Sequence, residues 1–165
     1  MILVIGYGNS LRGDDGAGLL LARQIEQACR QRGLPVERLE YQQLVPEIAL
    51  DILRDDVTAV IFTDTHVAHA GPGTNGVQIR VLSAADVSPT VGHHLTPATL
   101  LMYTHLLYGK QIPARLVTVP GFVFAHGQAI SSQTRSALKK AGPQISRLLD
   151  GLPQPEVAAN CLTPT

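Results

Sequence analysis

The 165-residue sequence has few cysteines, few aromatic residues and no excess charge of either sign. Its two cysteines, Cys29 and Cys161, are too few and too far apart for a disulfide framework or a CxxC zinc or redox motif, so we interpret both as inert thiols. Thirteen basic and thirteen acidic side chains give a formal net charge of zero. A neutral chain has no overall field to hold a polyanion, so we expect neither nucleic acid nor an anionic membrane as a partner.

Long hydrophobic runs are also missing. The apolar stretches are far shorter than the roughly 20 residues that cross a bilayer, and the N-terminal residues lack the features of a signal peptide. We therefore expect a cytoplasmic protein. The hydrophobic content of 45% suits one compact domain, which we place at residues 1–150, with a disordered tail at 151–165.

Strand-like apolar runs alternate with helix-like segments along the chain. We predict strands at 2–6, 36–41, 57–62, 77–82 and 116–119, and helices at 15–30, 46–53, 97–108 and 131–149, the last kinked or broken at Pro143. This alternation predicts a three-layer α/β domain. The run at 57–62 is the most strand-like and belongs at the sheet centre. Residues 65–76 are too polar and glycine-rich for a crossover helix, so the strand at 77–82 is predicted to be antiparallel and the sheet mixed.

A glycine-rich loop at residues 6–13 follows the first strand. The third glycine of a dinucleotide-binding G-x-G-x-x-G motif would fall on Leu11, and no Walker lysine follows. Asp14 and Asp15, at the start of the next helix, would repel a phosphate there. We interpret Asp14 as a helix cap, whereas the glycines around Asp15 predict close approach by a ligand, and a carboxylate there would attract a cation.

Three segments with metal-binding side chains are predicted to meet at the carboxyl edge of the sheet, where open α/β sheets bind ligands. Asp15 follows the first strand, Asp64 ends the central strand, and the pair His93-His94 leads into the helix capped by Thr96. A carboxylate that ends a buried strand needs hydrogen bonds, a countercharge or a metal. Two carboxylates and one imidazole suit nickel or zinc and leave coordination positions open.

Alternatives remain for each member of this set. Asp64 also fits a loop cap, and a lone loop histidine is more often a surface residue. Asp64, His66 and His69 form a rival local metal set, which ranks lower because the glycines and proline at 71–73 predict a mobile loop. His105 is predicted on a helix surface, and His126 has no partner that the sequence identifies.

Residues 4–18, V-I-G-Y-G-N-S-L-R-G-D-D-G-A-G, resemble the N-terminal signature of the [NiFe] hydrogenase maturation endopeptidases, G-x-G-N-x-L-x-x-D-D/E-x-x-G. Thr63-Asp64 with Pro72-Gly73-Thr74, and then His93-His94-Leu95, resemble the second and third blocks of that family in the same order and spacing. The resemblance covers residues 2–149. It implies a five-stranded mixed sheet between helices, with one strand antiparallel, as in the phosphorylase/hydrolase-like fold.

The resemblance also implies an activity. Family members remove a short C-terminal extension from the hydrogenase large-subunit precursor after nickel insertion, and the residues matching Asp15, Asp64 and His93 bind the metal and carry the catalysis. Nickel would arrive within the substrate, and zinc or cadmium could replace it in the isolated protein. The family is classed with aspartic-type endopeptidases, although the D-S/T-G motifs of pepsin-like enzymes are absent here. We expect a monomer. Two departures matter: some relatives have Glu at Asp15, and His94 is an adjacent rival to His93.

The sequence leaves two questions open. Either a carboxylate, Asp15 or Asp64, acts as general base, or the metal itself lowers the pKa of the attacking water. The rival functions are a non-catalytic nickel-binding hydrogenase chaperone and a zinc-dependent peptidase or hydrolase on the same fold.

The neutral total also hides an asymmetry. Residues 1–86 carry eleven acidic and seven basic side chains, whereas residues 87–165 carry two and six. The proposed site takes both carboxylates from the acidic half and its histidine from a stretch that has no Asp or Glu.

Overall fold

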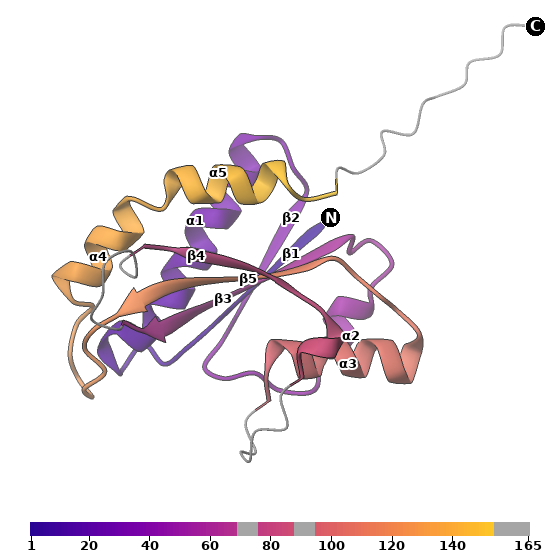
Figure 1. The fold of residues 1–165 in the computed structure, drawn as a ribbon, viewed down its shortest axis with the longest axis horizontal. Coiled ribbons are helices and arrows are strands. Elements are labelled where there is room, and N and C mark those ends of the chain that lie inside the picture. Colours follow the sequence, from indigo (N-terminus) through magenta and orange to yellow (C-terminus); the bar gives the residue numbers. More distant parts are fainter. Residues whose placement is uncertain (69–75, 88–94, 154–165) are drawn as a thin grey trace, which may run out of the picture.

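Five strands form one mixed sheet between two layers of helices in the computed structural model, which describes residues 1–68, 76–87 and 95–153 (Figure 1). The strands are β1 (Ile2–Tyr7), β2 (Val36–Tyr41), β3 (Ala59–Val67), β4 (Gln78–Leu82) and β5 (Ala114–Gly121). The helices are α1 (Ala17–Gln31), α2 (Ile48–Leu53), α3 (Pro97–Tyr108), α4 (Ser132–Lys139) and α5 (Gly142–Asp150), with short 3-10 helices η1 (Gly13–Gly16) and η2 (Ala84–Asp86). The predicted α/β class is confirmed.

The strand order is β2-β1-β3-β5-β4. Strands β1, β2, β3 and β5 are parallel, and β4 runs antiparallel to β5, so both the central position of β3 and the reversed strand at 77–82 are confirmed. The predicted end of the central strand was wrong. Residues Thr63 to Val67 continue the ladder against β5, so Asp64 lies inside β3 rather than after it.

Alternate strand residues point to opposite faces of the sheet and form two cores. One core joins the sheet to α1, α4 and α5 through residues such as Val4, Ile61 and Val117. The other joins it to α2 and α3 through residues such as Leu3 and Phe62. Even-numbered residues of β3 therefore face α2 and α3, and this parity fixes the direction in which Asp64 points.

The helix boundaries follow local chemistry. The predicted start of the first helix moves to Ala17, because residues 13–16 form the tighter η1 turn first. Helix α3 begins as predicted, where the Thr96 side chain accepts a hydrogen bond from the Thr99 N–H at 3.2 Å. It ends at Tyr108, because Gly109 adopts a left-handed conformation with a φ of 68°. The predicted last helix is interrupted between α4 and α5, because Pro143 can occupy a first helical turn but not a helix interior.

Residues just past the predicted domain end at 150 still pack on the core. Leu152 is buried against the core of α1 and α5, so packing continues just past residue 150. Residues 154–165, which hold most of the predicted tail and Cys161, lie outside the described residues; Cys29 is buried. None of the helices in the described part of the chain is long and apolar enough to cross a bilayer.

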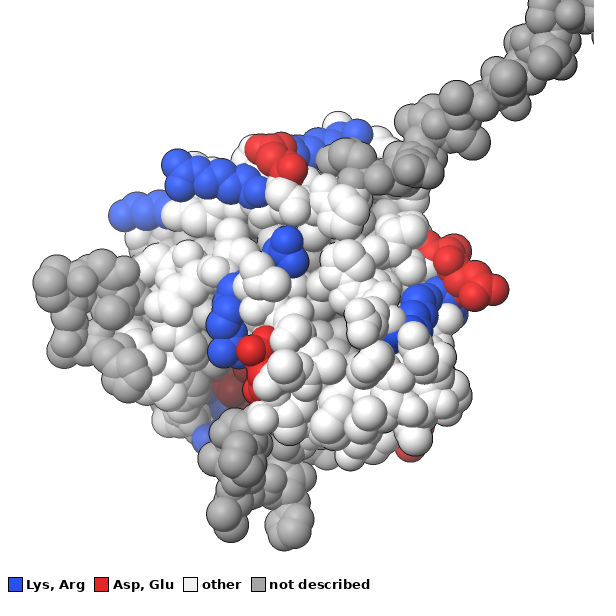
Figure 2. All heavy atoms as spheres, turned by 45° about the vertical axis from the view of Figure 1, so that its right-hand side comes forward, with Lys and Arg blue, Asp and Glu red and all other residues white. Residues whose placement is uncertain are grey.

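Charged side chains gather along β2. Ion pairs join Arg23 to Glu40 at 2.8 Å, Arg38 to Glu26 at 2.6 Å and Arg54 to Glu37 at 2.7 Å. The acidic half of the sequence thus neutralises many of its carboxylates with its own arginines. Figure 2 shows acidic and basic side chains in small separate groups with wide uncharged areas between them, so that face carries no single large field.

Candidate active site

Asp15 and Asp64 come from neighbouring parts of the carboxyl edge of the sheet. Asp15 lies in η1, which follows β1 by a short loop, and Asp64 lies near the carboxyl end of β3, the strand paired with β1. Asp64 also stands level with Thr118 of β5 in the parallel register. The structure therefore brings together two of the three predicted site residues.

Two glycines allow this close approach. Gly8 has a φ of 141°, and a Cβ there would lie 2.1 Å from the carbonyl oxygen of Asp15, so the loop after β1 can fold over η1 only without a side chain. At Gly18 a Cβ would lie 2.9 Å from the Cα of Asp64. The start of α1 therefore packs directly on β3 at the level of Asp64.

The charge of Asp15 acts on the carboxyl group of Asp64. Burial raises the pKa of Asp64, and the negative charge of Asp15 raises it further, against hydrogen bonds from Tyr7 and the Thr65 N–H that lower it. The Thr65 N–H donates to Asp64 at 2.7 Å, and the Asn9 N–H donates to Asp15 at 2.9 Å. Each acid is held by a main-chain donor, and a cation between them would relieve their mutual repulsion.

Tyr7 is a site residue that the sequence reasoning missed. Burial raises the pKa of its phenol, and the charge of Asp64 and a hydrogen bond to that carboxylate raise it further, while Arg80 has a smaller opposing effect. The phenol therefore keeps its proton and remains a donor to Asp64. The available signal was its place between Gly6 and Gly8 at the end of the first strand, facing the acids.

Asp14 has a different role from the predicted helix cap. Its side chain is fully buried, and η1 has no side-chain cap. It accepts hydrogen bonds from the N–H groups of Phe122 (2.8 Å), Val123 (2.9 Å) and Ser131 (2.6 Å), and from the Ser131 hydroxyl (2.7 Å). Burial would raise the pKa of Asp14, but these hydrogen bonds hold it below its usual range.

Thr65 connects the Asp14 anchor to the central strand. Its hydroxyl donates to the carbonyl of Asp14 at 2.9 Å and accepts from the Gly18 N–H at 3.1 Å. Thr65 is the neighbour of Asp64 and points to the opposite face of the sheet. The residues that precede Asp15 and follow Asp64 are thus bonded to each other, which fixes the relative position of the two acids.

The histidines are only partly accounted for. His93, the third predicted ligand, lies outside the described residues, as do His94, His69 and residues 72–74. His66 lies in β3, where its Nδ1 is 2.9 Å from the Thr118 hydroxyl and its Nε2 is 3.4 Å from the Gln78 amide.

Over residues 1–68, 76–87 and 95–153, no cluster of three His, Cys, Asp or Glu side chains is arranged to hold a metal ion. His126 is exposed in the loop after β5, and His105 lies on α3 near Gln111. Among the described residues, the acidic side chains brought together at this edge are therefore the pair Asp15 and Asp64.

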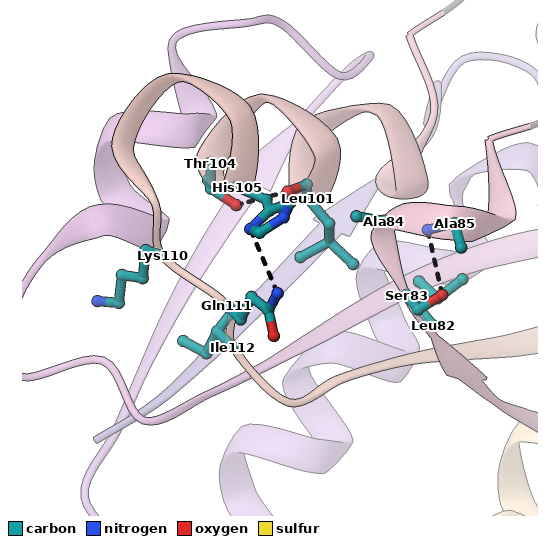
Figure 3. A pocket seen from close by; sticks show the side chains of 10 residues that line it. All are labelled: Leu82, Ser83, Ala84, Ala85, Leu101, Thr104, His105, Lys110, Gln111 and Ile112. Atoms are coloured by element: carbon teal, nitrogen blue, oxygen red, sulfur yellow. Dashed lines mark hydrogen bonds between the residues drawn. The ribbon is translucent and has the colours of Figure 1, made fainter.

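A hollow of about 360 Å³ lies between α3, η2 and the residues before β5 (Figure 3). Its rim includes Leu82, which pairs with Ala114 at the amino end of β5, whereas Asp64 is level with Thr118, further along that strand. Lys110 also lines the hollow, and its ammonium group donates a hydrogen bond to the carbonyl of Arg54 at 2.6 Å. The hollow lacks carboxylates and lies toward the edge opposite the acid pair, so we do not assign the active site to it.

Comparison with known proteins places this geometry in a known fold. No family model and no curated protein matches the sequence. The maturation protease HycI from Thermococcus kodakarensis KOD1 matches with a TM-score of 0.63 at 17% identity, over 90% of this chain and 92% of that chain. The endopeptidase HycI from Escherichia coli matches with a TM-score of 0.61 at 18% identity, over 93% and 96%. This chain has the fold of the [NiFe] hydrogenase maturation proteases.

A third structure of the same fold is the maturating endopeptidase HybD from Escherichia coli, with a TM-score of 0.58 at 20% identity, covering 90% of this chain and 91% of that chain. The fold implied by the motif resemblance is thereby confirmed over nearly the whole length. Asp15 and Asp64 both lie at the carboxyl edge of the sheet in this fold, close enough for the charge of Asp15 to act on Asp64.

Proposed function

We propose that this chain is an endopeptidase that removes the C-terminal extension of a [NiFe] hydrogenase large-subunit precursor after nickel insertion. The observation that carries the proposal is the pairing of Asp15 with Asp64 at the carboxyl edge of a maturation-protease fold. The glycine signature at residues 6–18 supports it, because its glycines are what bring the two acids together.

The proposed recognition element is nickel already bound to the precursor. Asp15 and Asp64 would complete its coordination together with His93, so that a precursor without nickel lacks this contact and is not cut. The chemistry of the donor set fits, since two carboxylates that repel each other favour a divalent cation between them. Zinc or cadmium could occupy the same position in isolated protein.

The residues have distinct parts in the proposed reaction. Nickel would polarise the scissile carbonyl, and a carboxylate beside it would take the proton of the attacking water. Asp64 would serve as this base, because burial raises its pKa and the charge of Asp15 adds to that rise, so its carboxylate holds a proton more readily than an exposed one. Tyr7 would hold the Asp64 carboxylate in place as a protonated donor.

The test mixes the protein with nickel-loaded and nickel-free precursor from the same organism and follows the large-subunit mass. We expect loss of a C-terminal peptide from the loaded form alone. Retention of full mass in both forms would reject the peptidase and leave the non-catalytic nickel chaperone. Cleavage that requires zinc bound stoichiometrically to the isolated protein would favour a zinc-dependent peptidase instead.

The histidine assignment has its own prediction. His93→Ala is expected to abolish cleavage of the nickel-loaded precursor, because the third metal ligand is lost, whereas His94→Ala is expected to retain it. Initial cleavage rates of the two variants, with circular dichroism to confirm folding, decide the matter. The reverse result would move the ligand by one residue to His94.

A further inference from the structure

We propose that the open edge of β4 binds an extended segment of the protein substrate as an additional strand of the sheet. This inference rests on the proposed function, since a peptidase that acts near a chain terminus has an extended peptide as its substrate. Strand β4 is the last in the order β2-β1-β3-β5-β4, and no described strand pairs with its outer side.

The directions of the main-chain groups follow from the ladder. The Val60 N–H of β3 donates to the carbonyl of Pro113 at 2.9 Å, so odd-numbered residues of this segment direct their polar groups toward β3. The main-chain N–H and C=O groups of even-numbered β5 residues therefore point toward β4, where Leu116 pairs with Arg80. On β4, the main-chain groups of the even-numbered residues accordingly form hydrogen bonds with β5.

The N–H and C=O groups of Ile79 and Val81 consequently point away from the sheet. They repeat at the two-residue interval that an incoming strand matches with its own main chain. The side chains of the same residues are 38% and 64% exposed, which leaves an apolar and β-branched strip beside the open edge. An edge of this kind favours pairing with another strand.

The opposite edge of the sheet is protected. Strand β2 carries Glu37, Arg38 and Glu40, all held in ion pairs, and charged edge residues oppose pairing with a further strand. Strand β4 carries one charged residue, Arg80. The two edges therefore differ in the feature that decides whether a foreign strand is accepted.

The open edge is continuous with the acid pair. Gln78 of β4 is level with Thr118 of β5, which is level with Asp64, and the Gln78 amide is 3.4 Å from His66. Three strand spacings place an added strand about 14 Å from the backbone of Asp64. An extended chain covers that distance in about four residues, so the paired segment lies about four residues or more from the bond that is cut.

The charge of this region selects among peptides. Arg80 lies on β4, Arg115 on β5 is level with Val81, and neither of these two strands contains Asp or Glu. A segment that is uncharged or acidic is thus favoured over a basic one. The occupant is therefore an extended substrate peptide of neutral or acidic character.

Amide hydrogen exchange tests the pairing directly. The probe is a synthetic peptide that spans the cleavage site of the precursor, added at saturating concentration to the full chain. The N–H groups of Ile79 and Val81 are expected to exchange at least about tenfold more slowly when the peptide is bound, as for a main-chain hydrogen bond of typical strength. Those of Arg80 and Leu82 already bond to β5 and are expected to change little. Unchanged exchange at Ile79 and Val81 would overturn the proposal.

A variant pair provides the kinetic test. Val81→Pro removes an outward N–H at an edge position that tolerates proline, and it is expected to raise KM for the precursor about five- to tenfold with kcat unchanged. Val81→Ala shortens the side chain of the apolar strip but keeps the N–H, and is expected to raise KM less than Val81→Pro does. Thermal unfolding confirms that both variants are folded.

The outcomes separate this proposal from the proposed function. Cleavage by the wild type, with Val81→Pro equal to it in KM, would reject the edge and leave the peptidase intact. Absence of cleavage by the wild type would reject the peptidase, and the exchange measurement would still decide whether the edge binds a peptide. Protection of Ile79 and Val81 that depends on protein concentration without peptide would show that a second copy pairs there, and would overturn the proposal.

Discussion

Replacing Asp64 with asparagine is expected to abolish cleavage of the nickel-loaded precursor and to make the fold more stable. The amide keeps the shape but loses a metal-binding charge and a base, so the cleavage rate should fall by at least about a hundredfold. Burial and the neighbouring Asp15 raise the pKa of Asp64, which means that its ionised form costs stability. The rate is measured by precursor mass, and the unfolding midpoint by circular dichroism.

The pH dependence of stability follows the same logic. The folded state holds the Asp64 proton more tightly than the unfolded chain, so this group stabilises the fold below its ordinary pKa, and that contribution is lost as pH rises through the raised folded pKa. The Asp64→Asn variant should not lose this stability as pH rises, so its unfolding midpoint should exceed that of the wild type most at neutral pH. The exposed Asp55 provides the control, because Asp55→Asn should leave both activity and midpoint near the wild type. A variant of Asp64 that is inactive and less stable would indicate a structural role.

Of the variants proposed, Asp14→Asn is expected to lower the free energy of unfolding most. The amide nitrogen cannot accept a hydrogen bond, so at least one of the donors from Phe122, Val123 and Ser131 is left buried and unsatisfied. We expect a loss of about 2–4 kcal/mol in the free energy of unfolding. In a chain of this size that corresponds to a fall in midpoint of roughly 5–15 °C, measured by thermal denaturation.

The sign of the pH effect is opposite to that for Asp64. Hydrogen bonds hold the pKa of Asp14 below its ordinary value, so its stabilisation is present above that ordinary value and is lost as pH falls through the folded pKa. The gap between wild type and Asp14→Asn should therefore narrow in acid. Ser131→Ala removes one donor group and keeps the carboxylate, so it should lower the free energy of unfolding less than Asp14→Asn does. A midpoint for Asp14→Asn equal to the wild type would contradict the anchor.

The sheet and the acid pair could be predicted from the sequence because both depend on local patterns. The apolar runs mark the strands, and the carboxyl-edge rule places Asp15 and Asp64 together once the strands are parallel. The extension of β3 through Val67 could not be predicted in this way. Residues 63–66 are all polar, and their strand conformation is stabilised by a partner, β5, about fifty residues later in the chain.

The role of Asp14 as a buried anchor could not be predicted from the sequence for a related reason. Two adjacent aspartates at a helix start look alike in sequence, yet one is fully buried against the loop after β5 and the other faces the site. Burial and main-chain donors are properties of the assembled fold, and no local pattern encodes them. The assignment of His93 remains a prediction that rests on the motif resemblance.

The hydrogen bonds of Asp14 also constrain the order in which the molecule is assembled. Its partners lie 108 to 117 residues further along the chain, so a very long loop must close before any of these bonds form. A nascent chain that ends before β5 already contains Asp15 and Asp64 but has no donors with which to bury Asp14. The glycine loop therefore reaches its final form late, and we expect the proposed peptidase activity only from the nearly complete chain.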